Sequence, residues 1–203
     1  MEHIIITLGR EYASGGSEIA QLAAERLGIP MYNKELITRA AKKSGLTEEA
    51  IAASENRRSG SLIYNLYMMG NTLPLADQVY ILQSNVIREL AEEGPCVILG
   101  RCGDYVMREN THALKVYVYA PLEERIARAK VRPGAKDQTD RQWEVEIAKH
   151  DRARASYYNY YTENRWGEAK NYDLCLNSSL GVEVCADLVV RAANALKEKL
   201  GHL

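Results

Sequence analysis

A glycine-rich segment between residues 9 and 17 is the part of the sequence best suited to chemistry. It reads Gly9-Arg10-Glu11-Tyr12-Ala13-Ser14-Gly15-Gly16-Ser17. Glycines allow backbone N–H groups to turn toward one anion, and the positive end of a following helix adds to the attraction. The segment therefore predicts a phosphate-binding loop. A glycine-rich turn that only joins a strand to a helix is the structural alternative.

The loop departs from the Walker motif, G-x-x-x-x-G-K-[ST], in two ways. Five residues rather than four separate Gly9 from Gly15, and Gly16 stands at the lysine position. In Walker enzymes the lysine stabilises charge on the β- and γ-phosphates, and losing such a donor typically costs on the order of 10²–10³ in rate. A cation from elsewhere must replace it, or the activity is weak. Arg10 could turn inward from the loop, and an arginine from farther along the chain is the alternative.

Short apolar runs alternate with helical patterns along the chain. Strands are predicted at residues 3–8, 96–99, 113–120 and 172–176. Helices are predicted from the end of the loop to Leu27 and at residues 32–44, 75–92, 121–130, 139–161 and 182–200. This alternation implies an α/β fold in which helices cover both faces of a parallel sheet. Ligands of such sheets bind at the carboxyl ends of the strands, which is where the loop follows the first strand.

The composition limits what kind of protein this is. Hydrophobic residues make up 46% of the chain and charged residues 26%, as in a globular protein. The net charge of −1 excludes a general attraction to nucleic acid or anionic lipid. Because we find neither a signal-like N-terminus nor a long apolar run, we expect a cytoplasmic protein without a membrane span. The four cysteines lack CxxC spacing and nearby histidines, so we expect them to be reduced and mostly buried.

The loop resembles the opening segment of the cytidylate kinase-like family, a divergent branch of the P-loop nucleoside monophosphate kinases. That branch commonly has a Gly-Gly pair instead of Gly-Lys, and a glycine where this chain has Ala13. Five further blocks resemble the family in the same order: residues 29–37, 99–106, 120–126, 151–167 and 171–177. The first of these departs at Asn33, where the family usually has aspartate. Six blocks in order are much more specific than any one of them.

The resemblance implies a P-loop NTPase-type three-layer sandwich that transfers a phosphoryl group from ATP to a nucleoside monophosphate, with Mg²⁺. A cytidylate-type acceptor, CMP or dCMP, is expected. The whole chain, 1–203, would be one domain, with a small monophosphate-binding insert at 33–73 and a lid at 131–165. The partner is then a small nucleotide rather than nucleic acid or a membrane, and a homo-oligomer could form through the helix at 75–92.

The resemblance also assigns residues to the two nucleotides. Ser14, Gly15, Gly16 and Ser17 would hold the β-phosphate of ATP. Ser17 would also bind Mg²⁺, although an alignment shifted by one residue gives that role to Glu18.

The acceptor would be bound by Lys34, Arg101, Asp104 and Arg152. Arg101 could hold its phosphate with a bidentate fork. Alternatively, Arg101 caps a strand end or pairs with Asp104, and Lys34 is an ordinary first-turn helix residue.

Four arginines are candidates for the catalytic cation: Arg10, Arg125, Arg128 and Arg154. Arg125 and Arg128 have i,i+3 helical spacing, and Arg154 lies beyond a Pro-Gly loop. Two basic arms around a flexible segment suit a lid that closes over phosphates. A solvated basic helix face is the alternative.

Two other functions remain open at this point. The chain could be a non-catalytic nucleotide-binding or sensing protein built on a kinase scaffold, because the Walker lysine is missing. It could also be a kinase for another small acceptor, because one scaffold hosts several acceptors.

Overall fold

A five-stranded parallel sheet forms the centre of the protein. The structure, a computed structural model, describes residues 3–33 and 74–201. The strands are β1 (Ile5–Arg10), β2 (Met31–Tyr32), β3 (Cys96–Leu99), β4 (Ala113–Tyr119) and β5 (Leu174–Asn177). Their order in the sheet is β2-β3-β1-β4-β5, and every neighbouring pair is parallel. The predicted parallel sheet is therefore confirmed.

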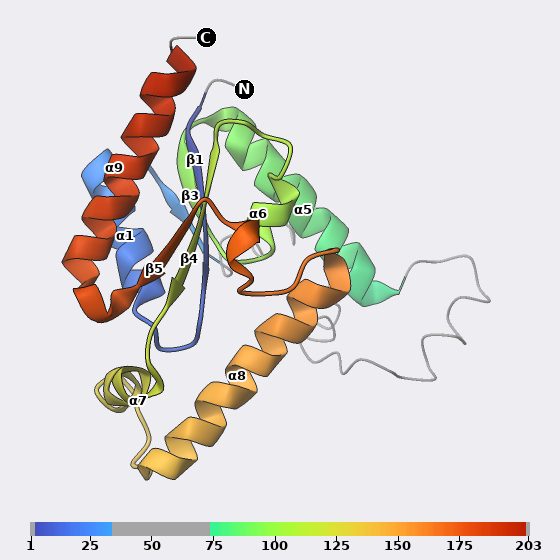
Figure 1. The fold of residues 1–203 in the computed structure, drawn as a ribbon. Helices are drawn as coiled ribbons and strands as arrows, with labels where there is room; N and C mark the ends of the chain where they lie inside the picture. Colours follow the sequence, from blue (N-terminus) through green and yellow to red (C-terminus); the bar gives the residue numbers. More distant parts are fainter. Residues whose placement is uncertain (1–2, 34–73, 202–203) are drawn as a thin grey trace.

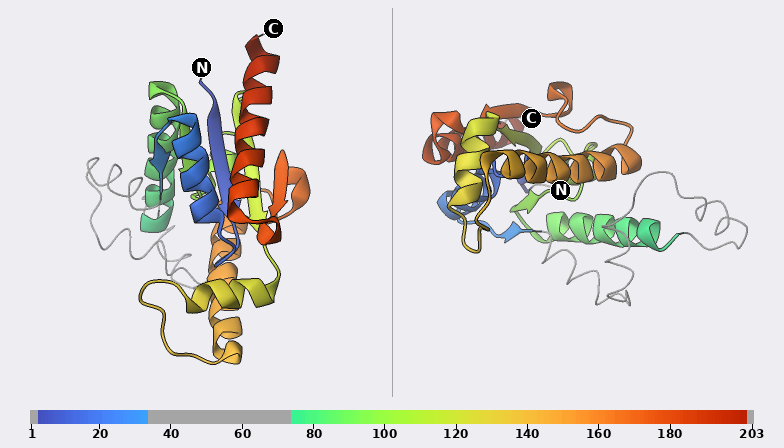
Figure 2. Two further views of the ribbon diagram at one scale, coloured as in Figure 1. Left: turned by 90° about the vertical axis from the view of Figure 1, so that its left-hand side faces the viewer. Right: turned by 90° about the horizontal axis from the view of Figure 1, so that it is seen from below.

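Helices cover both faces of the sheet. On one face lie α1 (Gly16–Leu27) and α9 (Val182–Gly201), and on the other lie α5 (Leu75–Glu93) and the short α6 (Gly103–Val106) (Figure 1). Two more helices, α7 (Leu122–Lys130) and α8 (Asp140–Tyr161), extend below the edge of the sheet where the β1–α1 loop lies (Figures 1 and 2). Single 3-10 turns flank β5, η2 (Ala169–Asn171) before it and η3 (Ser178–Leu180) after it. These layers confirm the predicted three-layer sandwich.

Small side chains allow α1 to lie close to the sheet and to α9. Ala20, Ala23 and Ala24 of α1 are buried, and so are Ala186 and Ala193 of α9. The loop that precedes α1 is therefore anchored on a rigid layer. A second core cluster, around Ile87 and Ile98, attaches α5 and α6 to the opposite face.

The first strand runs two residues farther than the sequence predicted. Gly9 pairs with Tyr117 and Arg10 with Val118, so both belong to β1 rather than to the loop. The extension occurs because β4 continues alongside and offers backbone partners. It fixes the direction in which the Arg10 side chain leaves the sheet. The two-residue strand β2 was also missed, because a pair of residues is too short to show a period.

The predicted helices at 75–92, 139–161 and 182–200 are confirmed to within a few residues. A capping box formed by Thr139 and Gln142 sets the start of α8.

All four cysteines are free, and Cys96, Cys102 and Cys185 are buried while Cys175 is exposed. Within the described residues, no helix is both long and apolar enough to cross a bilayer. Three predictions fall on residues 34–73, which lie outside the described residues: most of the insert at 33–73, most of the helix at 32–44, and the role of Lys34. Of these positions, the structure describes residues 32 and 33.

Truncating a central core side chain tests the packing around β1. Ile6 is 0% exposed, in the cluster between β1 and α1. Ile6→Ala should lower the free energy of unfolding by about 2–5 kcal/mol, because it removes buried methyl groups and leaves a cavity. Chemical denaturation measures the change. Val131→Ala is the control: Val131 is 83% exposed, so its replacement should change stability by less than about 0.5 kcal/mol.

Candidate active site

The loop between β1 and α1 presents backbone N–H groups at the carboxyl edge of the sheet. Gly15 is the N-cap residue of helix α1 and provides no side-chain cap, so the first N–H groups of the helix have no partner within it. Within the described residues, the N–H groups of Ala13 and Gly15 have no hydrogen-bond acceptor either. Ser14 is buried, and its hydroxyl donates to the Glu11 carbonyl oxygen at 2.9 Å. The loop therefore offers several N–H donors and the positive end of a helix to one anion.

Two loop residues adopt left-handed backbone angles. Gly15 has φ 78° and Ala13 has φ 59°. Glycine adopts this conformation without steric cost, whereas alanine costs about 1–2 kcal/mol there. Ala13 therefore stands in a conformation that glycine would adopt at a lower cost. Contacts elsewhere must hold Ala13 in place.

Three charged side chains, which we call the loop clamp, provide such contacts: Glu11, Arg125 of α7 and Asp151 of α8. Asp151 accepts the Tyr12 N–H through Oδ1 at 2.8 Å and pairs with Arg125 through Oδ2. Arg125 donates from Nε to the Tyr12 carbonyl oxygen at 2.7 Å, and its Nη1 lies 3.1 Å from Glu11 Oε2. Glu11 Oε2 also accepts the Ala120 N–H at 3.2 Å. Both backbone groups of Tyr12 are therefore held from outside the loop.

Arg125 was predicted as a candidate catalytic cation, and the structure places it in this clamp. Its side chain is 8% exposed and lies between two carboxylates. Burial raises the pKa of Glu11, and the nearby Arg125 charge opposes that effect. Neither Glu11 nor Asp151 was identified as a site residue from the sequence.

The Arg10 side chain extends from Gly16, which stands at the position of the Walker lysine, to the end of β3. A Cβ atom added to Gly16 would lie 2.6 Å from Arg10 Cβ, and one added to Gly100 would lie 2.5 Å from Arg10 Nη1. Real Cβ atoms do not approach that closely, so both glycines make room for the arginine. Its guanidinium thus lies at the carboxyl end of β3, beside the residue that precedes Arg101.

Arg128 and Arg154 approach the loop from two sides. Arg128 lies 3.6 Å from the Cβ position of Gly15 and donates to Ser178 Oγ at 3.1 Å and to the Ser178 carbonyl oxygen at 3.2 Å. Arg154 of α8 donates to the Arg10 carbonyl oxygen at 2.9 Å. Burial lowers the pKa of Arg154, and the Asp151 charge opposes the shift. Both arginines therefore lie next to the predicted phosphate loop.

The chain after β3 is strained and turns back over the sheet. Arg101 and Cys102 are consecutive non-glycine residues with φ 56° and 54°. The Arg101 guanidinium carbon lies 5.5 Å from the centre of the Tyr157 ring, and its Nη1 lies 3.5 Å from Gln83 Oε1. Such strained residues concentrate at functional sites. Arg101 thus lies near Arg10, between α5 and α8.

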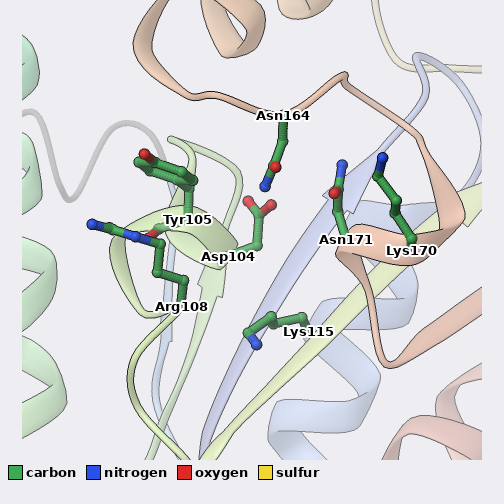
Figure 3. A pocket seen from close by; sticks show the side chains of 7 residues that line it. All are labelled: Asp104, Tyr105, Arg108, Lys115, Asn164, Lys170 and Asn171. Carbon is green, nitrogen blue, oxygen red and sulfur yellow. The ribbon is translucent and has the colours of Figure 1, made fainter.

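Asp104 is separated from the phosphate loop. It lies in α6 over the face of the sheet, 7% exposed, and accepts the Tyr158 hydroxyl at 2.6 Å. It borders a cavity of about 340 Å³ together with Tyr105, Arg108, Lys115, Asn164, Lys170 and Asn171 (Figure 3). Two of the cations there have acidic neighbours, Glu109 beside Arg108 and Glu168 beside Lys170. The structure therefore does not bring Asp104 together with Arg10 or the loop.

The other predicted residues lie on the surface. Arg152 is exposed on α8, and the described part of the chain supplies no partner for it. Ser17 is exposed and borders a groove with Glu18, Gln21 and Val182. Among the described residues, no three acidic, histidine or cysteine side chains form a metal-binding group. A Mg²⁺ ion held mainly by phosphates and water needs only one or two protein ligands, so the Ser17 hydroxyl or the Glu18 carboxylate is an oxygen ligand of a fitting kind.

The titration of Asp104 can be tested by Asp104→Asn. Burial raises the pKa of Asp104, so the folded state binds the proton more tightly than the unfolded state, whose pKa is about 3.9. The free energy of unfolding of the wild type should therefore fall as the pH rises from about 4 through the raised pKa. Asparagine accepts the Tyr158 hydroxyl without titrating, so this part of the slope should vanish. Urea unfolding at a series of pH values measures it, and an unchanged slope would contradict the assignment.

Solved structures share this fold. A protein from Eubacterium ventriosum ATCC 27560, described as uncharacterized, is 26% identical with a TM-score of 0.74, covering 95% of this chain and 99% of its own. A shikimate kinase from Bacteroides thetaiotaomicron is 13% identical with a TM-score of 0.57, over 94% and 98% of the chains. A sugar kinase from Janibacter sp. HTCC2649 is 12% identical with a TM-score of 0.52, over 93% of both chains. No curated protein matches the chain.

The sequence itself matches a family model. The match extends over residues 5–180, from the first residue of β1 past the end of β5. It includes the phosphate loop, the loop clamp and the strained turn after β3. The resemblance noted from six sequence blocks is thereby confirmed, and the chain belongs to the cytidylate kinase-like family.

Proposed function

We propose that this protein transfers a phosphoryl group from ATP to a nucleoside monophosphate of the cytidylate type, and that Arg10 replaces the Walker lysine. Family and fold support a small-molecule kinase. The observation that carries the role of Arg10 is the path of its side chain past Gly16 and Gly100. A lysine at position 16 and an arginine at position 10 would compete for the same space.

The donor nucleotide fits the loop between Ala13 and Ser17. The N–H groups there bind the β-phosphate, and Arg128 next to Gly15 and Ser178 adds positive charge on the outer side. Mg²⁺, when bound with ATP, neutralises charge on the β- and γ-phosphates. Ser17 or Glu18 would hold the ion. Phosphoryl transfer demands little covalent chemistry from the protein, so this positioning is its main contribution.

The acceptor phosphate would lie toward the end of β3. Arg101 offers a planar fork to that phosphate, and Arg10 lies between it and the donor loop. In this position Arg10 would stabilise charge that spreads over the transferred group in the transition state. Lys34 and Arg152 would complete the acceptor side.

Exchanging the two positions tests Arg10. Arg10→Gln should lower kcat by about 10²–10³, because it removes a cation that acts on the transferred group. Gly16→Lys alone should be inactive, because its Cβ meets Arg10 Cβ. The double variant Arg10→Gly/Gly16→Lys should recover part of the lost activity. Steady-state kinetics with Mg-ATP measures these rates.

Arg88→Gln is the matched control for this exchange. Arg88 is an exposed arginine of α5 that bonds Asn85, away from the loop. Its replacement should leave kcat within twofold. Wild-type activity of Arg10→Gln would contradict the role of Arg10.

An acceptor panel tests the function itself. ADP release from Mg-ATP should require CMP or dCMP, whereas other monophosphates, nucleosides, shikimate and a hexose should give much less. Signal only with another compound would replace the acceptor and keep the kinase. Measurable ATP binding without ADP release in any case would contradict catalysis and favour a nucleotide sensor.

A further inference from the structure

We propose that Asp151 is a positioning residue of the phosphoryl transfer: through Tyr12 and Arg125, the lid helix α8 sets the conformation of the phosphate loop. This inference rests on the proposed function, because it concerns how the same loop holds the donor phosphates. It goes beyond that function by making the shape of the loop depend on a residue 139 positions away from Tyr12.

The first argument concerns the backbone of the loop. The Tyr12 N–H donates to Asp151 Oδ1 at 2.8 Å, and the Tyr12 carbonyl oxygen accepts from Arg125 Nε at 2.7 Å. Asp151 also pairs with Arg125, so both attachments share one ion pair. The next residue is Ala13 in its left-handed conformation. After it come the loop N–H groups to which the proposed function assigns the β-phosphate of ATP. The ion pair therefore holds the peptide that determines where those groups point.

The second argument concerns the side chains around Tyr12. Its ring stacks on His150 of α8, with the ring centroids 4.1 Å apart at an angle of 11°. The Arg132 guanidinium carbon, from the segment between α7 and α8, lies 4.9 Å from the centroid of the same Tyr12 ring. One turn along α8, Arg154 donates to the Arg10 carbonyl oxygen. Helix α8 thus contacts Arg10 at the end of β1 through the backbone, and Tyr12 in the loop through both backbone and ring.

The third argument concerns charge. Glu11 and Asp151 place two carboxylates beside a loop that would bind a polyphosphate, and by Coulomb's law alone they weaken anion binding. Arg125 and Arg154 balance them. Simple electrostatics therefore predicts that removing the Asp151 charge strengthens binding of ATP and ADP. The positioning role predicts the opposite, because the loop amides lose their alignment.

The test compares Asp151→Asn with the wild type. In steady-state kinetics the KM for ATP should rise at least tenfold, while the KM for CMP stays within twofold. The Kd for ADP, measured by titration calorimetry, should also rise at least tenfold. A variant that merely unfolds in part would lose kcat with both KM values unchanged. Arg125→Lys keeps the charge but loses the fork that reaches Tyr12, and it should show the same donor-specific change.

Two control variants separate the loss of the Asp151 contacts from the loss of a carboxylate elsewhere on α8. Glu144→Gln removes a carboxylate of α8 that pairs with Arg141 and does not reach the loop, so it should leave all three constants unchanged. Asp151→Glu, which retains the charge, should recover part of the ADP affinity. Thermal unfolding identifies any variant that must be assayed at a lower temperature.

The outcomes separate this inference from the proposed function. Unchanged or tighter ADP binding by Asp151→Asn would overturn the positioning role even if the wild type is an active kinase. Weaker ADP binding by Asp151→Asn, with no transfer to any acceptor by the wild type, would support the positioning role and overturn the proposed function. Absence of ADP binding by the wild type would overturn both.

Discussion

Three charged side chains, the buried Arg125 and the half-buried Glu11 and Asp151, meet where the phosphate loop leaves the sheet. Burying such charges is expensive unless each of them is paired and hydrogen-bonded. Here Arg125 is paired with both carboxylates. The other oxygen of Asp151 accepts the Tyr12 N–H, and the oxygen of Glu11 that faces Arg125 also accepts the Ala120 N–H. The cluster joins β1, β4, α7 and α8 at one point. The left-handed Ala13, the uncapped start of α1 and the direction of Arg10 all lie within a few residues of it.

Space limits which side chains can stand at positions 10 and 16 together. Gly16 lacks a side chain at the place where Arg10 leaves β1, and Gly100 lacks one where the guanidinium ends. A cation that enters from the first strand reaches the end of β3, whereas a Walker lysine enters from the start of the helix. The two arrangements exclude each other sterically. A glycine at position 16 is therefore what the Arg10 side chain requires in this loop.

The turn after β3 combines strained backbone with tyrosines that pack around it. Arg101 and Cys102 both have left-handed angles, which non-glycine residues adopt only when their surroundings hold them. Gln83 and Tyr157 supply part of that support from α5 and α8, and Tyr80 stacks on Tyr161 at 4.2 Å between the same helices. Tyr157 and Tyr161 of α8 thus pack against Tyr80 of α5. Helix α8 therefore contacts both the β1–α1 loop and the turn after β3.

Local signals in the sequence determined the secondary structure and the place of the loop. Alternating apolar runs and helical periods indicated the parallel sheet, and glycines after the first run indicated the phosphate loop at its carboxyl edge. Arg10, Arg128 and Arg154 were candidates because of their charge, and all three lie beside the loop. These inferences depend on neighbours in the chain, which a sequence displays directly.

Only the tertiary structure decided which charges meet. In the sequence, Arg125 and Arg128 were equal candidates for the catalytic cation. In the structure, Glu11 and Asp151 enclose Arg125, whereas Arg128 lies against Gly15 and Ser178. Asp104 stands three residues from Arg101, but the chain reverses over the sheet and buries it against Tyr158. Asp151 had no signal strong enough to select it. A pairing across more than a hundred residues depends on how helices pack, and periodicity within one segment carries no information about it.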